Sequence, residues 1–140
     1  MSNNTIEQIE LPRTLINQLM THAQSGNTNE VCGLIASHNG VPVKTYPVAN
    51  IATTPGERFE MEPQALIATI KEMRTQDEEI YAIYHSHPAS PASPSQRDID
   101  EFNYPEALSL IISLDNQGVL EMRAYRMLSD HAVEIAIEVE

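Results

Sequence analysis

The chain has 140 residues, 41% of them hydrophobic, which suits a single domain with one core over residues 1–140. Its 20 acidic residues outnumber the 8 basic ones and give a net charge of −12, which argues against a nucleic-acid partner because such binding depends on clustered Lys and Arg. No basic segment followed by an apolar one opens the sequence and no apolar run approaches ~18 residues, so we expect a cytoplasmic protein without a membrane partner.

An amphipathic helix is predicted near the N-terminus, from Pro12 to Gln24. Pro12 suits the first turn of a helix, where its missing N–H is not needed. The first residues, 1–5, show no hydrophobic pattern and are expected to form a flexible end. Apolar side chains recur at helical spacing along the predicted helix: Leu15, Ile16, Leu19, Met20 and Ala23.

A β-hairpin is predicted next. The short apolar run 31–36 is typical of a buried strand, and Asn39-Gly40 after it is a strong signal for a tight turn. The second strand should span 41–48. Because Pro42 and Pro47 cannot donate hydrogen bonds to a neighbouring strand, this second strand should lie near an edge of the sheet.

A loop and a second helix follow the hairpin. Residues 50–56 are predicted to form the loop, and residues 58–61 a short extended piece. Glu62-Pro63 suits the start of the helix, since Pro is favoured in the first helical turn. The predicted buried stripe of this helix consists of Leu66, Ile67, Ile70 and Met73.

The central part of the chain combines an interior strand with a proline-rich loop. The strand is predicted over 79–84, and the loop over 85–94. A short helix from 95 to about 104 and a strongly buried strand over 108–114 come next. The loop carries three prolines, Pro88, Pro91 and Pro94.

The C-terminal part is predicted to contain a turn at 115–118 and two alternating strands, 119–127 and 133–139. The resulting order is helix, two or three strands, helix, strand, short helix and three strands. This order indicates the α/β class, with a mixed sheet flanked by helices.

Two histidines separated by one residue, His85 and His87, directly follow the central predicted strand. In extended backbone such residues point to the same side, so both imidazoles can reach one ion. Asp98, 11 positions after His87, offers a carboxylate as a third ligand. Three protein ligands leave a fourth tetrahedral position for water, which is the mark of a catalytic zinc site.

Each part of this pattern also has an ordinary explanation. A His-x-His after a strand is by itself a weak signal, and Ser95-x-x-Asp98 is a capping box for a helix that begins after Ser95. The spacing of the whole set is more specific than either part.

The complete pattern resembles the motif of the JAMM (MPN+) metallopeptidases. It consists of His85-Ser86-His87-Pro88, seven residues between His87 and Ser95, and Ser95-x-x-Asp98. Glu30, in Glu30-Val31-Cys32-Gly33-Leu34, occupies the place of the family's glutamate at the start of a strand. The resemblance covers roughly residues 8–138 and extends through Arg58-Phe59-Glu60-Met61, Ile83-Tyr84 and Tyr104-Pro105.

The resemblance implies a curved mixed sheet flanked by helices, related to the cytidine-deaminase fold, in a single domain. It also implies Zn²⁺ held by His85, His87 and Asp98, with Glu30 as general base and Ser95 as donor to the oxyanion. The chain looks most similar to small stand-alone bacterial members that act on ubiquitin-like sulfur-carrier proteins. The implied activity is hydrolysis of an amide bond after the C-terminal glycine of such a carrier.

Two alternative functions remain open at this stage. Relatives of this fold that lack the metal residues serve as non-catalytic interaction modules, but all five motif residues are present here. Longer bacterial relatives with the same motif are associated with DNA repair, which the acidic composition disfavours.

The remaining candidate residues have plain interpretations. Without the motif, Glu30 would be interpreted as a surface carboxylate. Cys32, the single cysteine, excludes an internal disulfide; it is a candidate thiol nucleophile, but its apolar neighbours favour a small buried side chain. His22, His38 and His131 lack partner spacing and are predicted to be solvated.

Overall fold

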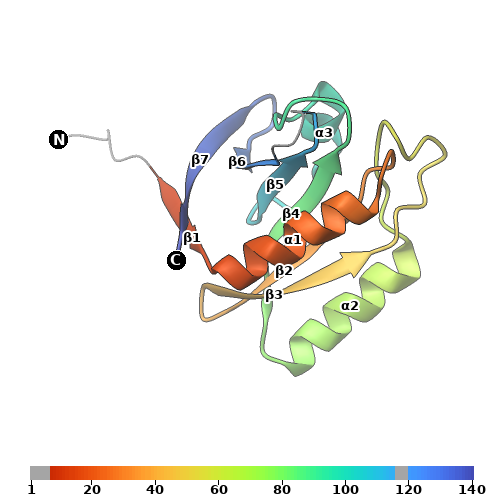
Figure 1. Cartoon of the computed structure of the whole chain (residues 1–140). Coiled ribbons are helices and arrows are strands. Elements are labelled where there is room, and N and C mark those ends of the chain that lie inside the picture. Colours follow the sequence, from red (N-terminus) through yellow and green to blue (C-terminus); the bar gives the residue numbers. More distant parts are fainter. Residues whose placement is uncertain (1–6, 116–119) are drawn as a thin grey trace.

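The computed structural model describes residues 7–115 and 120–140. The predicted flexible end at 1–5, residues 116–118 of the predicted turn, and Val119 lie outside the described residues. Seven strands form one mixed sheet in the order β1-β7-β6-β5-β4-β2-β3 (Figure 1). No helix of the described part is long and apolar enough to cross a membrane.

The predicted hairpin is confirmed as β2, Cys32–His38, and β3, Val41–Val48, paired antiparallel. Asn39 and Gly40 connect the strands with φ of 52° and 81°, the left-handed conformation that this kind of tight turn needs. The strand β3 is the last of its sheet. Its prolines are therefore tolerated at the edge position that the sequence predicts.

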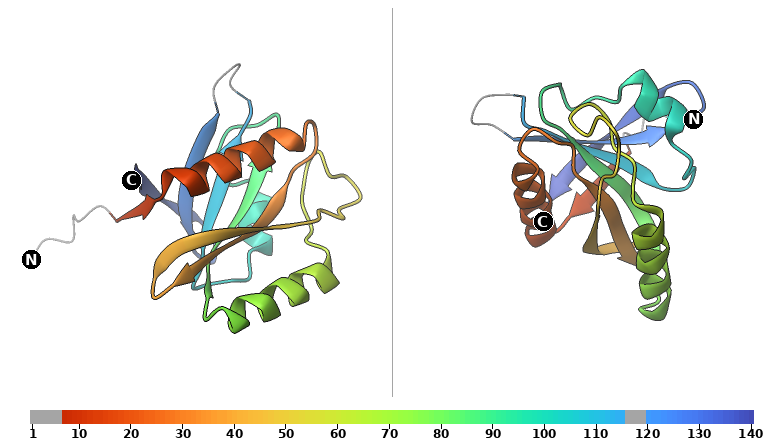
Figure 2. Two further views of the ribbon diagram at one scale, coloured as in Figure 1. Left: turned by 60° about the horizontal axis from the view of Figure 1, so that its bottom comes forward. Right: turned by 90° about the vertical axis from the view of Figure 1, so that its right-hand side faces the viewer.

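The two long helices cover opposite faces of the sheet (Figure 2). Helix α1, Arg13–Ser25, packs Leu15, Leu19 and Ala23 against alternate residues of the strands, including Ile35 and Leu110. Helix α2, Pro63–Thr75, packs Met73 against the other face, where Leu34 and Ile83 lie. Because successive residues of a strand point to opposite faces, the central strands contribute side chains to both hydrophobic cores.

One residue of the predicted stripe on α2 does not belong to it. Ile67 is 55% exposed, whereas Leu66 and Ile70 pack against the core cluster around Met73. In a helix with 3.6 residues per turn, Ile67 is rotated by about 100° from Leu66, away from the line through positions 66, 70 and 73. The prediction for Ile67 is wrong because its neighbours already fill the stripe.

Strand β4, Glu79–His87, is longer than the predicted strand over 79–84. It pairs in parallel with β5, Leu108–Ser113, and the pairing continues to His87, which lies opposite Ser113. The two histidines therefore end a strand instead of beginning the loop. Helix α3, Gln96–Glu101, starts where expected but ends before Phe102, short of the predicted end near residue 104.

The strand β1, Gln8–Leu11, is absent from the prediction. It is too short for its alternation to be distinctive, and it is stabilised by parallel pairing with β7, Ala132–Val139, more than a hundred residues away. Between β5 and β7 lies β6, Glu121–Met127. The α/β class with a curved mixed sheet flanked by helices is confirmed (Figure 1).

Candidate metal centre

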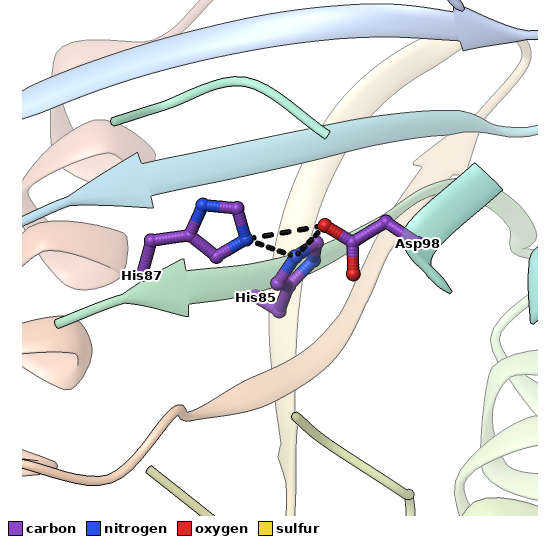
Figure 3. Close-up of side chains that lie close together, drawn as sticks. All are labelled: His85, His87 and Asp98. Carbon is purple, nitrogen blue, oxygen red and sulfur yellow. Dashed lines mark hydrogen bonds and ion pairs between the residues drawn. The ribbon is translucent and has the colours of Figure 1, made fainter. Parts of the chain in front are cut away.

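Strand β4 presents its two histidines on the same side, two residues apart (Figure 3). Their side chains are nearly inaccessible, with His85 exposed by 2% and His87 by 4%. Ser86 between them points the other way and is fully buried. The alternation of the strand, extended by three residues beyond the prediction, is what brings both imidazoles to one point.

Helix α3 supplies the carboxylate of Asp98 through its first turn. The hydroxyl of Ser95 accepts a hydrogen bond from the backbone N–H of Asp98 at 3.0 Å. In return the backbone N–H of Ser95 donates to Oδ2 of Asp98 at 2.9 Å. The capping-box interpretation of Ser95 and Asp98 is confirmed, and it is compatible with the site because the same cap aims Asp98 at the histidines.

Three potential ligand atoms converge between β4 and α3 (Figure 3). The Nε2 atoms of His85 and His87 are 3.1 Å apart, and Oδ2 of Asp98 lies 3.3 Å from the first and 3.1 Å from the second. A tetrahedral zinc with bonds of about 2.0–2.1 Å separates its ligand atoms by about 3.3 Å. The spacing of the three atoms therefore fits a shared metal ion.

The tautomer of His87 also fits a ligand. Its Nδ1 lies 2.7 Å from the backbone oxygen of Pro91. A carbonyl oxygen only accepts, so Nδ1 carries a proton, which leaves Nε2 as the ring atom available to a metal. The proline-rich loop thereby orients one ligand, a role that the sequence pattern did not reveal.

The environment of His85 is apolar. The ring of Phe59 stacks on its imidazole with centroids 4.5 Å apart. Its Nδ1 is buried and has no hydrogen-bond partner among the residues that the structure describes. Phe59 was part of the family resemblance, but nothing in its spacing indicated contact with the site.

The charges of the cluster favour a cation. Burial alone would raise the pKa of Asp98, but the neighbouring His85 and His87 and the backbone N–H of Ser95 hold it well below its usual range. Burial lowers the pKa of His85. For His87, burial has the same direction, but the Asp98 carboxylate and the Pro91 carbonyl raise its pKa. An ionised carboxylate beside two imidazole nitrogens is the donor set that a divalent metal prefers.

Glu30 lies two residues before the start of β2, close to this cluster but outside it. It is only 6% exposed, so the interpretation as a surface carboxylate is wrong. Burial raises the pKa of Glu30 to about 7, although the charge of His87 opposes the shift. Its Oε1 has no hydrogen-bond partner within the described part of the chain. A carboxyl group with a pKa near neutrality is suited to proton transfer.

A cavity of about 270 Å³ opens beside His85 and Asp98. Its lining is mainly apolar and aromatic, with the guanidinium groups of Arg58 and Arg97 among the polar groups. Such a mixed lining is typical of a binding site. The aromatic residues are Phe59, Phe102 and Tyr104.

Cys32 and His22 are both in contact with the interior of the protein. Cys32 is fully buried, its thiol lies 3.3 Å from the backbone oxygen of Val48, and burial raises its pKa to about 12. It is the buried side chain predicted, not a reactive thiol. His22 is not simply solvated, because its Nδ1 lies 2.8 Å from the buried hydroxyl of Tyr84. His38 and His131 are exposed, as predicted.

The mixed sheet and helix α3 together bring two imidazoles and one carboxylate to one point, with a buried glutamate nearby, and so define a domain built around a candidate metal centre. The chain belongs to the prokaryotic homologues of the JAB domain, whose family model matches residues 12–128. This confirms the resemblance to the JAMM family. Proteins of this family are typically metal-dependent, which agrees with the group formed by His85, His87 and Asp98.

Three similar proteins span nearly the whole chain. A desampylase of Haloferax volcanii is 27% identical over 97% of this chain and 99% of its own length. A CysO-cysteine peptidase of Mycobacterium tuberculosis is 26% identical over 99% and 96%, respectively. A solution structure of a Desulfitobacterium hafniense protein is 29% identical, covers 95% of this chain and 93% of that one, and superposes with a TM-score of 0.84.

Proposed function

We propose that the protein is a zinc-dependent peptidase that hydrolyses an amide bond after the C-terminal glycine of a ubiquitin-like sulfur-carrier protein. The observation that carries this proposal is the convergence of His85, His87 and Asp98 beside a buried Glu30. The names of the full-length relatives, a desampylase and a CysO-cysteine peptidase, support a peptidase acting on carrier conjugates.

In the proposed mechanism His85, His87 and Asp98 hold the metal. Bound zinc would supply a Lewis acid that polarises the scissile carbonyl and acidifies a water. Glu30 takes a proton from the attacking water and passes it to the leaving amine. Burial raises the pKa of Glu30, and a raised pKa suits a group that must accept a proton and release it again.

Ser95 is proposed to donate a hydrogen bond to the carbonyl oxygen as negative charge develops there. Its hydroxyl oxygen already accepts the N–H of Asp98, which leaves the hydroxyl proton free to donate. Capping of α3 and stabilisation of the oxyanion are therefore compatible. Loss of such a donor costs roughly 2.7–4 kcal/mol of transition-state stabilisation in other hydrolases.

The proposed substrate is a carrier whose Gly-Gly tail bears an additional amino acid or a conjugated protein. Glycine has no side chain, so a Gly-Gly tail lets the peptide backbone approach a buried centre closely. The folded part of the carrier would contribute binding energy that positions the tail, so unstructured peptides should be poor substrates. Nucleic acid has no place in this proposal, in agreement with the net charge of −12.

The decisive experiment incubates the zinc-loaded protein with a sulfur carrier extended by one amino acid beyond Gly-Gly and follows the carrier mass. Loss of that one residue is expected with the wild-type protein and not with Glu30→Gln. An intact carrier after incubation with fully zinc-loaded wild-type protein would contradict the proposal and favour a non-catalytic interaction module.

A further inference from the structure

Asn50, which follows β3, uses its whole side chain to organise the backbone beside the candidate metal centre. Its Nδ2 donates to the carbonyl oxygen of Glu30 at 2.9 Å and to that of Arg58 at 3.1 Å. Its Oδ1 accepts from the backbone N–H groups of Ala52 at 3.0 Å and Glu60 at 2.9 Å. Both donated protons and the acceptor oxygen of the amide are satisfied.

These bonds join two segments that meet at the site. One contains Glu30 and leads into β2. The other, around Arg58 and Glu60, carries Phe59, whose ring stacks on His85. A single amide therefore connects the backbone of the proposed base with the backbone that packs against a proposed ligand.

The other side of Glu30 is tied to β4. The backbone N–H of Val31 donates to the hydroxyl of Ser86 at 2.9 Å, and the N–H of Ser86 donates to the carbonyl of Val31 at 3.0 Å. Ser86 stands between His85 and His87. The N–H of Glu30 itself donates to the carbonyl of Pro55 at 2.7 Å. The backbone on both sides of Glu30 is thus fixed relative to the histidines.

The carboxylate of Glu30 lacks comparable support. Its Oε1 is buried and has no hydrogen-bond partner in the described part of the chain. Where no side-chain bond holds a group in place, its position follows from its backbone. The hydrogen bonds to Asn50, Ser86 and Pro55 fix the backbone from which the Glu30 side chain extends.

We propose that Asn50 is a positioning residue, whose amide holds Glu30 in the place from which it exchanges protons with the substrate and the attacking water. This inference rests on the proposed function, because it assumes that Glu30 is the base. It assigns no contact with substrate or metal to Asn50. The alternative is that Asn50 stabilises the loop after β3 without any specific effect on catalysis.

Asn50→Asp separates these possibilities. Aspartate has nearly the same shape and keeps an oxygen for the N–H groups of Ala52 and Glu60, but it cannot donate to the carbonyls of Glu30 and Arg58. We expect kcat on the extended carrier to fall by ~10–10²-fold, since small displacements of a reacting group have effects of this size. KM and zinc content should remain close to those of the wild type, and the loss of two hydrogen bonds should lower the unfolding temperature without abolishing the cooperative transition.

Two further variants control for the added charge. Asn50→Ala removes the same donated bonds without a negative charge and should also lower kcat. Asn17→Asp introduces the same charge on an exposed residue of α1 and should leave kcat unchanged. If both Asn50 variants lose their zinc or no longer unfold cooperatively, Asn50 is needed for the folded structure as a whole, and the proposal is overturned.

A double-mutant cycle with Glu30→Gln gives the sharpest result. If Asn50 acts through Glu30, Asn50→Asp should lower kcat much less in the Glu30→Gln background than in the wild type. Single-turnover assays with enzyme in excess keep the slow rates measurable. An equal loss in both backgrounds, or full kcat in Asn50→Asp, would overturn the positioning role while leaving the proposed function intact. Full kcat in Glu30→Gln would instead show that Glu30 is not the general base.

Discussion

Oδ2 of Asp98 lies 3.1 Å from Nε2 of His87 while it accepts the backbone N–H of Ser95. One carboxylate oxygen thus connects the start of α3 to the end of β4. The two imidazole nitrogens beside it are only 3.1 Å apart. A proton between two of these three atoms forms a hydrogen bond within one pair only. A cation at their centre binds all three atoms at once, which leads to the first prediction.

His87→Ala should remove most of the bound zinc, because two remaining ligands bind zinc far more weakly than three. Elemental analysis should give about one zinc ion per wild-type chain. The matched control is His131→Ala, at an exposed residue that pairs with Asp130, and it should retain the metal. Full zinc occupancy in His87→Ala would show that the ligand set is wrong.

Glu30→Gln should retain zinc but lower turnover by ~10² or more, because the amide cannot accept a proton. Cys32→Ala is the comparison, since Cys32 is buried close by. Its turnover should stay near that of the wild type. Both variants are measured on the extended carrier with zinc content determined in parallel; equal losses would point to a thiol mechanism.

The candidate site could be predicted from the sequence because its ligands lie close together along the chain. His85 and His87 share one strand, and Asp98 follows within one loop and one helical turn, so spacing alone carries the geometry. Glu30 has no such local signal, and it was identified only through the family resemblance. Its burial depends on contacts with segments distant in sequence.

The features that sequence reasoning missed depend on long-range packing. The strand β1 exists because β7 pairs with it, and β4 continues to His87 because β5 continues beside it. Likewise, His22 gains its partner only when α1 packs on β4, which brings it to Tyr84. Asn50 was assigned to a loop, since a fully bonded amide leaves no pattern in the sequence.

Gly33→Ala should destabilise the fold. A Cβ atom there would lie 2.5 Å from the backbone oxygen of Tyr46 and 2.6 Å from the ring of Tyr84, so the strands would have to shift. Overpacking of this kind costs ~1–3 kcal/mol, measurable as a lower free energy of unfolding in urea.

Gly40→Ala is the control for Gly33→Ala, because a Cβ at Gly40 meets no atom within 4 Å. Its cost should come only from the positive φ of the turn, roughly 1–2 kcal/mol. Wild-type stability of Gly33→Ala would contradict the close approach of β2 and β3 at this point.

His22 should make stability depend on pH. Burial lowers its pKa below the ordinary value of 6.5, so the unfolded chain binds a proton more readily than the folded one. The free energy of unfolding should therefore fall as the pH drops through about 6.5. In His22→Gln this contribution is absent, and the loss of stability between about pH 8 and about pH 5 should be smaller than in the wild type. Parallel loss in both proteins, measured by urea denaturation, would contradict the prediction.

The last prediction concerns the Gly-Gly tail of the proposed carrier. His85 and His87 are buried, the side chain of Asp98 is 11% exposed, and Phe59 and Arg58 line the cavity beside them. A tail bound in this cavity would contact these residues, and a bulky residue one position before the terminal glycine would keep the scissile carbonyl away from the metal. Replacing the penultimate glycine of the carrier by Leu should therefore lower the cleavage rate by ~10²-fold.

The measurement compares two carriers by mass spectrometry, both extended by the same amino acid and differing only at the penultimate glycine. An unstructured peptide with the same last residues serves as a third substrate, and it should be cut slowly because it lacks the folded part of the carrier. If the Leu carrier or the peptide is cut as fast as the Gly-Gly carrier, the proposed selectivity is wrong. That result would leave the proposed metal site standing, because zinc content is measured independently of substrate selectivity.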